Sequence, residues 1–183
     1  MWLDSDDFLF PFAIERLEEV IVHNDADIII TNIQRDFKQD KKDLIKAEES
    51  RTWMHGKIYR TQFLIDNRIL FPSDLATNED LAFNLSLYAY NPESYLMDEE
   101  VYYFRNNPNS ITKQTDKIRK CTSVDYIDAI YYAYLHFRKN NCELSWLMIS
   151  NILNCYNYYQ RGIVFNTLQE VHKQHMRRML HDP

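Results

Sequence analysis

Glycine is scarce in this sequence, which contains only Gly56 and Gly162 among its 183 residues. At the average usage of about 7%, a chain of this length has roughly thirteen. Loops that hold phosphates through glycine need several residues without a Cβ near the pyrophosphate. The sequence therefore excludes both a G-x-G-x-x-G turn and a P-loop. If the protein handles a nucleotide, other groups must hold its phosphates.

Cysteine pairs, long apolar runs and a basic amino-terminus are also lacking. The three cysteines form no C-x-x-C pair and are odd in number, which favours a reduced, intracellular protein. The first ten residues are acidic where a signal peptide is basic. No apolar stretch approaches the roughly 20 residues needed to span a membrane. We therefore expect a cytoplasmic protein with no transmembrane segment, and attachment to a membrane surface is left open.

The amino-terminal part of the chain contains few basic residues. Residues 1–34 carry eight acids and one base, a balance of −7, whereas residues 35–183 carry 19 acids and 20 bases, a balance of +1. Nonspecific nucleic-acid binding needs a basic field, so we expect no nucleic-acid partner. The bases near the end, Lys173, Arg177 and Arg178, are typical of a solvated helix end. The acidic amino-terminal segment is suited instead to binding a divalent cation.

What the sequence does contain is a pattern of alternating strands and helices followed by a helical region. Hydrophobic residues make up 45% of the chain and charged residues 26%, the balance of a globular protein. Apolar runs and turn residues predict the strands: 1–3, 27–33, 95–97 and 101–105. Helical spacing and capping residues predict the helices: one opened by Pro11, 61–67, one from Thr77, 116–138, 143–160 and 163–180, with Gly162 as a C-cap. We expect residues 35–50 to form a charged surface excursion and 53–59 an extended or irregular segment.

The acidic run Asp4-Ser-Asp-Asp7 follows the first predicted strand directly. Carboxylates at the end of a strand are hard oxygen ligands that suit Mg²⁺ or Mn²⁺. Such a cation stabilises the charge that develops on a departing diphosphate. The alternative is a helix N-terminus whose dipole is complemented by acids. The motifs that follow in the chain favour the cation site.

Four motifs occur in order over residues 2–112. They are Leu3–Asp7 with Pro11 and Ala26-Asp-Ile-Ile29; Trp53-Met-His-Gly-Lys-Ile-Tyr-Arg60; Phe71-Pro72 with Asn78-Glu-Asp-Leu-Ala-Phe-Asn84; and Tyr102-Tyr-Phe-Arg105 with Ser110-Ile-Thr112. In this order and spacing the chain resembles the family-two glycosyltransferases with the GT-A fold. The resemblance implies an α/β fold: a partial, Rossmann-like GT-A sheet with flanking helices, followed by an all-helical carboxy-terminal region.

The resemblance also implies roles for the acidic residues. Asp4 would face the sugar nucleotide and the metal, and Asp6 would ligate the metal directly. Asp80 would be the general base that deprotonates the acceptor hydroxyl for inverting displacement at the anomeric carbon. Glu79 would hold the acceptor or support Asp80. Taken without the resemblance, Glu79 and Asp80 are typical acids of a first helical turn.

Four further residues would contact the donor or the acceptor. Arg105 and Ser110 would reach the donor diphosphate, for which a guanidinium is well matched in shape and charge. Lys57 is a weaker candidate for the same region, and Trp53, which alone would be a core residue, is a further one. Phe104 stands where some relatives carry a histidine that also ligates the metal, so the resemblance implies a more weakly held cation.

Family members place further strands, and the acid that reads the nucleotide base, before the acidic motif. The resemblance therefore implies that residues 1–112 are the acceptor-side and metal-site portion of a GT-A domain and that residues 113–183 are a helical carboxy-terminal region. It implies a carboxy-terminal portion, completed by a second chain, by self-association or by another segment. A nucleotide sugar should then bind only weakly to this chain alone.

The function that we expect is transfer of a sugar from a nucleotide-diphosphate sugar to an acceptor hydroxyl, with inversion and with Mn²⁺ or Mg²⁺. The acceptor would be a glycan, a lipid-linked molecule or a protein. The alternative is a catalytically incomplete remnant that acts as a binding or assembly protein through its helical region, 116–180. The presence of Asp4, Asp6, Asp80 and Arg105 together favours the enzyme.

Overall fold

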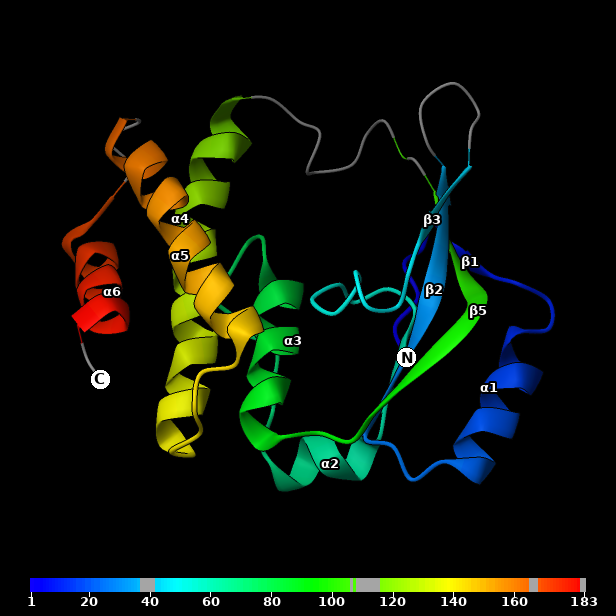
Figure 1. Cartoon of the computed structure of the whole chain (residues 1–183). Coiled ribbons are helices and arrows are strands. Elements are labelled where there is room, and N and C mark those ends of the chain that lie inside the picture. Colours follow the sequence, from blue (N-terminus) through cyan, green and yellow to red (C-terminus); the bar gives the residue numbers. More distant parts are fainter. Residues whose placement is uncertain (37–41, 106, 108–115, 165–167, 182–183) are drawn as a thin grey trace. The chain divides into compact units, whose positions relative to one another are not determined.

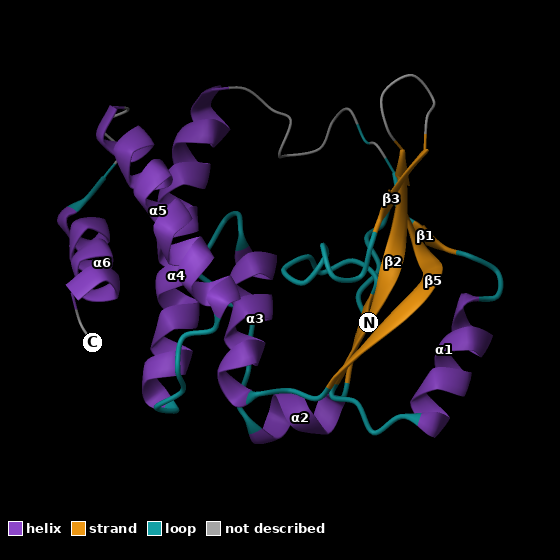
Figure 2. Cartoon of the chain, viewed as in Figure 1, coloured by secondary structure: helices purple, strands orange, loops and turns teal. Residues whose placement is uncertain are grey.

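The computed structural model describes residues 1–36, 42–105, 107, 116–164 and 168–181. The chain forms two compact units. Unit 1 comprises Met1–Arg68 and Pro92–Pro108, and unit 2 comprises Ile69–Asn91 and Asn109–Pro183. In the described parts, all strands belong to unit 1, and unit 2 is helical (Figure 2). The segment 69–91, which the sequence placed with the first region, groups with the helices.

Unit 1 is built on a five-stranded sheet of mixed direction (Figure 1). Its strands are β1 (Phe8–Leu9), β2 (Ile28–Asp36), β3 (Lys42–Ile45), β4 (Lys57–Tyr59) and β5 (Ser94–Phe104). β5 lies between β1 and β2, parallel to β2 and antiparallel to β1. β4 and β3 pair antiparallel with the first and last parts of β2. The central position of β2 accounts for its buried run of isoleucines.

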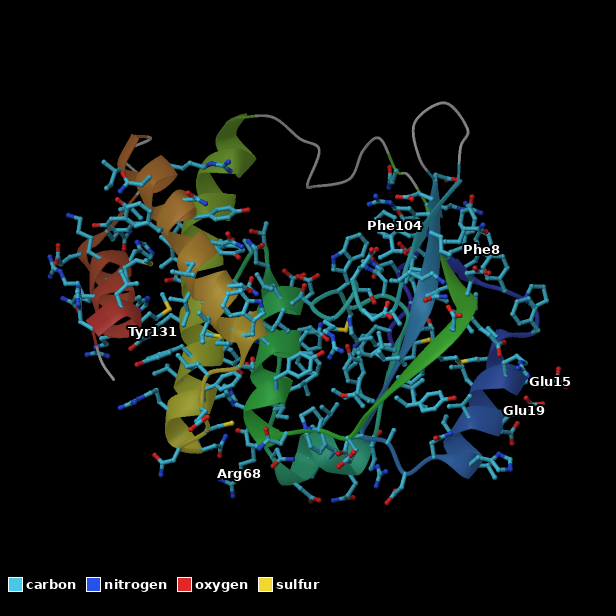
Figure 3. The ribbon with its side chains drawn as sticks, in the orientation of Figure 1. Phe8, Glu15, Glu19, Arg68, Phe104 and Tyr131 are labelled. Carbon is cyan, nitrogen blue, oxygen red and sulfur yellow. The ribbon has the colours of Figure 1, made fainter. Side chains whose placement is uncertain are left out.

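Two helices belong to unit 1, α1 (Ala13–His23) and α2 (Thr61–Asp66). α1 is amphipathic: its buried Ala13 and Leu17 pack in one apolar cluster with residues of β2 and β5. Glu15 and Glu19 point away from the sheet (Figure 3). Arg16 of α1 donates from Nε to Glu99 of β5 at 2.9 Å, and this hydrogen bond lowers the pKa of the Glu99 carboxyl.

Unit 2 is organised around α4 (Asp116–Lys139). The helices α3 (Glu79–Leu87), α5 (Trp146–Val164) and α6 (Glu170–His181) all pack against it, and a short 3₁₀ turn, η2 (Tyr88–Tyr90), follows α3. The core between these helices is aliphatic and aromatic, as expected from the tyrosine-rich sequence, and its members include Ile127, Ile130, Phe137, Met148 and Cys155. No helix in the described ranges is long and apolar enough to cross a membrane.

Polar contacts join α6 to α4 in addition to apolar packing. Asp128 of α4 lies 3.3 Å from His172 Nε2 and 3.0 Å from His175 Nδ1. The other ring nitrogen of His172 accepts from the Gln169 backbone N–H at 2.9 Å, as the third residue of a capping box does at a helix N-terminus. Arg178 donates to the Tyr131 hydroxyl at 2.7 Å. The histidines and arginine of this helix therefore fix its position within unit 2.

Several predicted elements are wrong in detail. Residues 1–3 form no strand, and the first strand, β1, comes after the acidic turn. The segment 35–50, predicted to be a charged surface excursion, contains the strand β3. Asp43 of β3 faces Arg35 across the β2–β3 pair, and the two form an ion pair at 2.7 Å that stabilises the pairing. Gly162 is not a cap, since α5 continues to Val164. The strands predicted at 95–97 and 101–105 are one strand, β5, with a register shift opposite residues 31–33 of β2.

Candidate functional site

The acidic run forms a tight turn whose last carboxylate is fixed by the sheet. The Asp7 backbone N–H donates to the Asp4 carbonyl at 3.1 Å. The Asp7 side chain is only 1% exposed; its Oδ2 accepts from the Tyr102 hydroxyl at 2.6 Å and its Oδ1 from the Arg105 backbone N–H at 2.8 Å. Burial and the Asp7 carboxylate raise the pKa of the Tyr102 phenol. The phenol therefore stays protonated and orients Asp7.

His55 lies against this turn from the segment before β4. Its Nε2 is 3.3 Å from Asp4 Oδ2 and 3.9 Å from Asp7 Oδ2. Its ring packs edge-on against Tyr102 and Phe104, with centroids 5.4 and 4.8 Å away. Phe104 is labelled in Figure 3 near the end of β5. His55 Nδ1 is buried and has no hydrogen-bond partner among the described residues, so packing, rather than a hydrogen bond at Nδ1, holds the ring with Nε2 toward the carboxylates.

Asp4, Asp7 and His55 together could hold a metal ion. One ligand atom of each lies within 4.8 Å of the others. Two carboxylate oxygens and an imidazole nitrogen make a donor set that suits Mn²⁺ and related divalent cations. The Asp4 side chain is 61% exposed and the His55 side chain 17%, so the group opens to solvent on the Asp4 side. The residues present therefore fit the cation that the sequence led us to expect.

Asp6 and Arg105, both predicted site residues, lie beside this group. Asp6 Oδ2 accepts from Asn107 Nδ2 at 2.8 Å and does not belong to the three-residue group. The Arg105 side chain is directed over the ring of Phe8, with Cζ 5.5 Å from its centroid. Arg105 is exposed and only one residue from the Tyr102–Phe104 end of β5. The Arg105 backbone thus contacts Asp7, while contact of its guanidinium with a diphosphate and a metal-ligating role for Asp6 stay predictions.

Trp53 and Lys57 belong to the segment that carries His55. Trp53 is half-buried, and its ring lies edge-on to Phe104 with centroids 6.4 Å apart. Lys57 is 1% exposed, and its amine donates to the backbone carbonyls of Ser50 and Trp53. The Lys57 ammonium thus closes the loop that precedes β4. Contact of either residue with a donor stays a prediction.

The remaining predicted residues lie elsewhere in the chain. Glu79 and Asp80 form the first turn of α3 in unit 2. Asp80 Oδ1 accepts from the Leu81 backbone N–H at 2.7 Å. The predicted hydroxyl cap is wrong: Thr77 donates to Asp125 of α4 at 2.9 Å instead, and the N-cap of α3 is Asn78 with a positive φ of 63°. Ser110 lies outside the described residues.

Asp7 and His55 were not among the predicted metal ligands. The acidic run contains Asp7, but the family resemblance implies metal-binding roles for Asp4 and Asp6 only. The position of His55 next to Gly56 could have identified it. When a chain contains very few glycines, each one indicates a position where the backbone conformation requires glycine. The chain turns back there, with a φ of 63° at Gly56, and brings His55 to the acidic turn.

Comparisons with known proteins agree with the fold. No protein-family model matches the chain. Over 133 residues it is 25% identical to EpsJ of Bacillus subtilis strain 168, an uncharacterized glycosyltransferase, and this match covers 61% of the chain and 39% of EpsJ. Over 115 residues it is 25% identical to TarS of Staphylococcus aureus strain Mu50, a poly(ribitol-phosphate) β-N-acetylglucosaminyltransferase. That second match covers 57% of the chain and 20% of TarS.

Solved structures of S. aureus TarS share the architecture. Residues 1–349 of TarS in complex with UDP-GlcNAc match 90% of the chain with a TM-score of 0.55 and 17% identity, and the match covers 48% of the TarS chain. The complex with UDP matches with a TM-score of 0.53 and 18% identity and covers 46% of the TarS chain. At this identity the likeness shows the fold, an open α/β sheet with flanking helices, consistent with a partial GT-A-like domain. The chain spans less than half the length of these relatives.

Proposed function

We propose that this chain is the acceptor-side and metal-site portion of a glycosyltransferase that moves a sugar from a nucleotide-diphosphate sugar to an acceptor hydroxyl, with inversion. The relatives that it resembles in sequence are glycosyltransferases. TarS is described in complexes with UDP and with UDP-GlcNAc, so UDP-GlcNAc is the first donor to test. The acceptor would be a glycan, a lipid-linked molecule or a protein in the cytoplasm.

The observation that carries this proposal is the arrangement of carboxylates in the acidic turn. Asp7 is buried with both oxygens hydrogen-bonded, while Asp4 stands at the surface beside it. The burial of a charge is unfavourable unless it is compensated, and the hydrogen bonds from Tyr102 and Arg105 hold the Asp7 carboxylate in place beside Asp4. A bound Mn²⁺ or Mg²⁺ supplies a positive charge that stabilises the leaving diphosphate. We propose that Asp4 and its neighbours hold this cation and that Arg105 adds a second positive charge on the diphosphate.

The acceptor side of the reaction is assigned to α3. Asp80 would accept the proton of the attacking hydroxyl as the bond to the anomeric carbon forms and the bond to the diphosphate breaks. Glu79, exposed in the same helical turn, would bind another hydroxyl of the acceptor. Both carboxylates lie at a helix N-terminus, where the dipole favours their ionised forms. An ionised Asp80 is the form that a general base requires.

Donor hydrolysis and transfer with Mn²⁺ test the proposal. UDP release from UDP-GlcNAc is measured for the wild-type chain, for Asp80→Asn and for Asp74→Asn, an exposed aspartate of the same unit that serves as the matched control. We expect Asp80→Asn to lower transfer by a factor of at least about 10², the usual contribution of a general base, and Asp74→Asn to leave it unchanged. Equal activity in all three would contradict the assignment of Asp80. No activity in any of them would favour a remnant with a binding or assembly role, or a portion that is incomplete without its missing part.

The proposal includes a second polypeptide segment that pairs with the sheet. On its side away from β2, β5 pairs with β1 only at Tyr102 and Tyr103 within the described residues. Tyr95 and Leu96, farther along the same strand, are each 37% exposed. An unpaired strand edge with exposed apolar side chains is a site of strand addition. Gel filtration with light scattering should show self-association or binding of a second chain, and a stable monomer that binds no apolar dye would contradict this part.

A further inference from the structure

We propose that His55 is the nitrogen ligand of the divalent-cation site, together with oxygens of Asp4 and Asp7, and that it makes the site prefer Mn²⁺ to Mg²⁺. The sequence motifs alone pointed to Asp4 and Asp6. The inference rests on the metal-dependent part of the function proposed above, and it names the ligand set of that site.

The distances leave room for a cation among the three side chains. His55 Nε2 forms a hydrogen bond with Asp4 Oδ2 at 3.3 Å and lies 3.9 Å from Asp7 Oδ2, and a good N–H···O bond is about 2.9–3.0 Å long. Neighbouring ligands of an octahedral ion with bonds of about 2.1 Å are about 3 Å apart, and opposite ligands about 4.2 Å. The observed separations lie between these two values. A cation bound by all three atoms would replace the long His55–Asp4 hydrogen bond.

The charge around the site also favours a cation. Within the described residues, neither Asp4 nor Asp7 forms an ion pair with a lysine or arginine. Four basic residues of unit 1 are instead paired elsewhere, in Arg16–Glu99, Arg35–Asp43, Lys46–Asp98 and Arg60–Asp25. Two neighbouring carboxylates, one of them buried, therefore lack a fixed positive charge. Buried charges that are not paired with side chains commonly coordinate metals.

Gly56 is the positioning residue for His55. Its φ of 63° is left-handed, and a Cβ at this position would lie 2.8 Å from Thr31 Oγ1 and 2.9 Å from Ile33 Cγ1. The Gly56 carbonyl accepts from both the backbone N–H and the hydroxyl of Thr31, at 2.9 and 3.0 Å. The residue after His55 is thus pressed against β2 and held by two hydrogen bonds. Any side chain there would push the His55 backbone away from the carboxylates.

A nitrogen ligand changes which cation is preferred. Imidazole suits transition-metal ions, whereas Mg²⁺ binds mainly carboxylate oxygens and water. The structure thus predicts a higher affinity for Mn²⁺ than for Mg²⁺, and His55 is the source of the difference. Replacement of His55 by aspartate should keep a cation site of oxygen ligands and remove that preference.

Mn²⁺ binding to the full chain tests the ligand set without any measurement of activity. The signal of free Mn²⁺ in electron paramagnetic resonance gives the affinity for the wild type and each variant. We expect His55→Ala to bind Mn²⁺ at least tenfold more weakly. His23→Ala should bind as the wild type does, because His23 is an exposed histidine of the same unit that lies outside the three-residue group. His55→Asp should bind Mn²⁺ and Mg²⁺ with similar affinity.

Spin-echo modulation of the bound Mn²⁺ provides a second readout, and its result for the wild-type protein does not depend on how the variants fold. Wild-type protein should show modulation from a directly bound ¹⁴N nucleus, and His55→Asp should not. A wild-type site without nitrogen modulation, or one abolished by Asp6→Asn but unaffected by His55→Ala, would overturn the inference. Nitrogen-ligated Mn²⁺ on a chain that transfers no sugar would leave the inference standing while the proposed function fails.

Discussion

The substitution Gly56→Ala tests whether the segment that carries His55 is held as tightly as the structure indicates. The positive φ costs an L-residue about 1–2 kcal/mol. The added methyl meets Thr31 Oγ1 and Ile33 Cγ1 at 2.8 and 2.9 Å, and both atoms belong to a buried central strand that cannot move aside easily. Overpacking of this kind costs about 1–3 kcal/mol. The two effects together predict a loss of about 2–5 kcal/mol from a total stability of about 5–15 kcal/mol.

Urea unfolding followed by tryptophan fluorescence measures this loss in unit 1. Trp2 and Trp53 lie in unit 1 and Trp146 in unit 2, so a Trp146→Phe background reports unit 1 alone. Arg68→Gly is the control for the backbone effect, because Arg68 is exposed and has a similar φ of 52°. It should stabilise unit 1 by up to about 1 kcal/mol. If Gly56→Ala unfolded within about 0.5 kcal/mol of its parent, as ordinary surface changes do, the described position of this segment would be refuted.

Three further outcomes follow from contacts described above. Lys57→Met should destabilise unit 1 by about 1–3 kcal/mol, because two carbonyls lose their donor; a loss of donor affinity with unchanged unfolding would instead assign this lysine to the donor. Glu99→Gln should make unit 1 less sensitive to acid. The pKa of Glu99 is lowered in the folded state, so its ionised form stabilises the fold at a pH above its unfolded-state pKa, and this stabilisation is lost as the pH falls through its folded-state pKa. The difference between the variant and the wild type should be smaller in high salt, which screens the attraction between Glu99 and Arg16. Asp128→Asn should leave unit 1 unchanged and increase amide exchange in α6, where His172 loses its partner, and unaltered exchange would contradict the described contact.

Much of the fold could be predicted because its signals are local. The amphipathic pattern of α1, the isoleucine run of β2 and the helices α4 and α5 are each confirmed within a few residues, whereas α6 begins at Glu170, seven residues after its predicted start at 163. The short strand β3 was missed because its four residues, Lys42–Ile45, are two charged residues followed by two apolar ones and show no alternation, and pairing with the end of β2 decides its conformation. The grouping of α3 with the helices was missed for a similar reason. It depends on packing against α4, a contact distant in sequence.

The sequence predicted which part of the chain contributes to the candidate site, the acidic turn, but not all of the residues that the structure brings together there. The motif spacing located the acidic turn, yet the partner of Asp4 and Asp7 comes from a segment about fifty residues later in the chain, and no local pattern of His55 records that contact. The burial of Asp7 is likewise nonlocal, because it depends on the Tyr102 hydroxyl and the Arg105 backbone N–H at the end of β5. Sequence periodicity reports which face of an element is apolar. It does not report which polar groups meet across the fold.

The middle of β2 explains why the site can be built with so little glycine. β4 pairs with Ile28–Ile30 and β3 with residues 33–36, which leaves Thr31 and Asn32 between the two partner strands. Their buried side chains bind the intervening segment: Thr31 donates to the Gly56 carbonyl, and Asn32 Oδ1 accepts from the Ala47 backbone N–H at 2.9 Å. Two polar residues in an apolar strand thus anchor the loop that ends at His55. A rigid ligand position then requires one glycine, at the turn, where a phosphate-binding loop would require several.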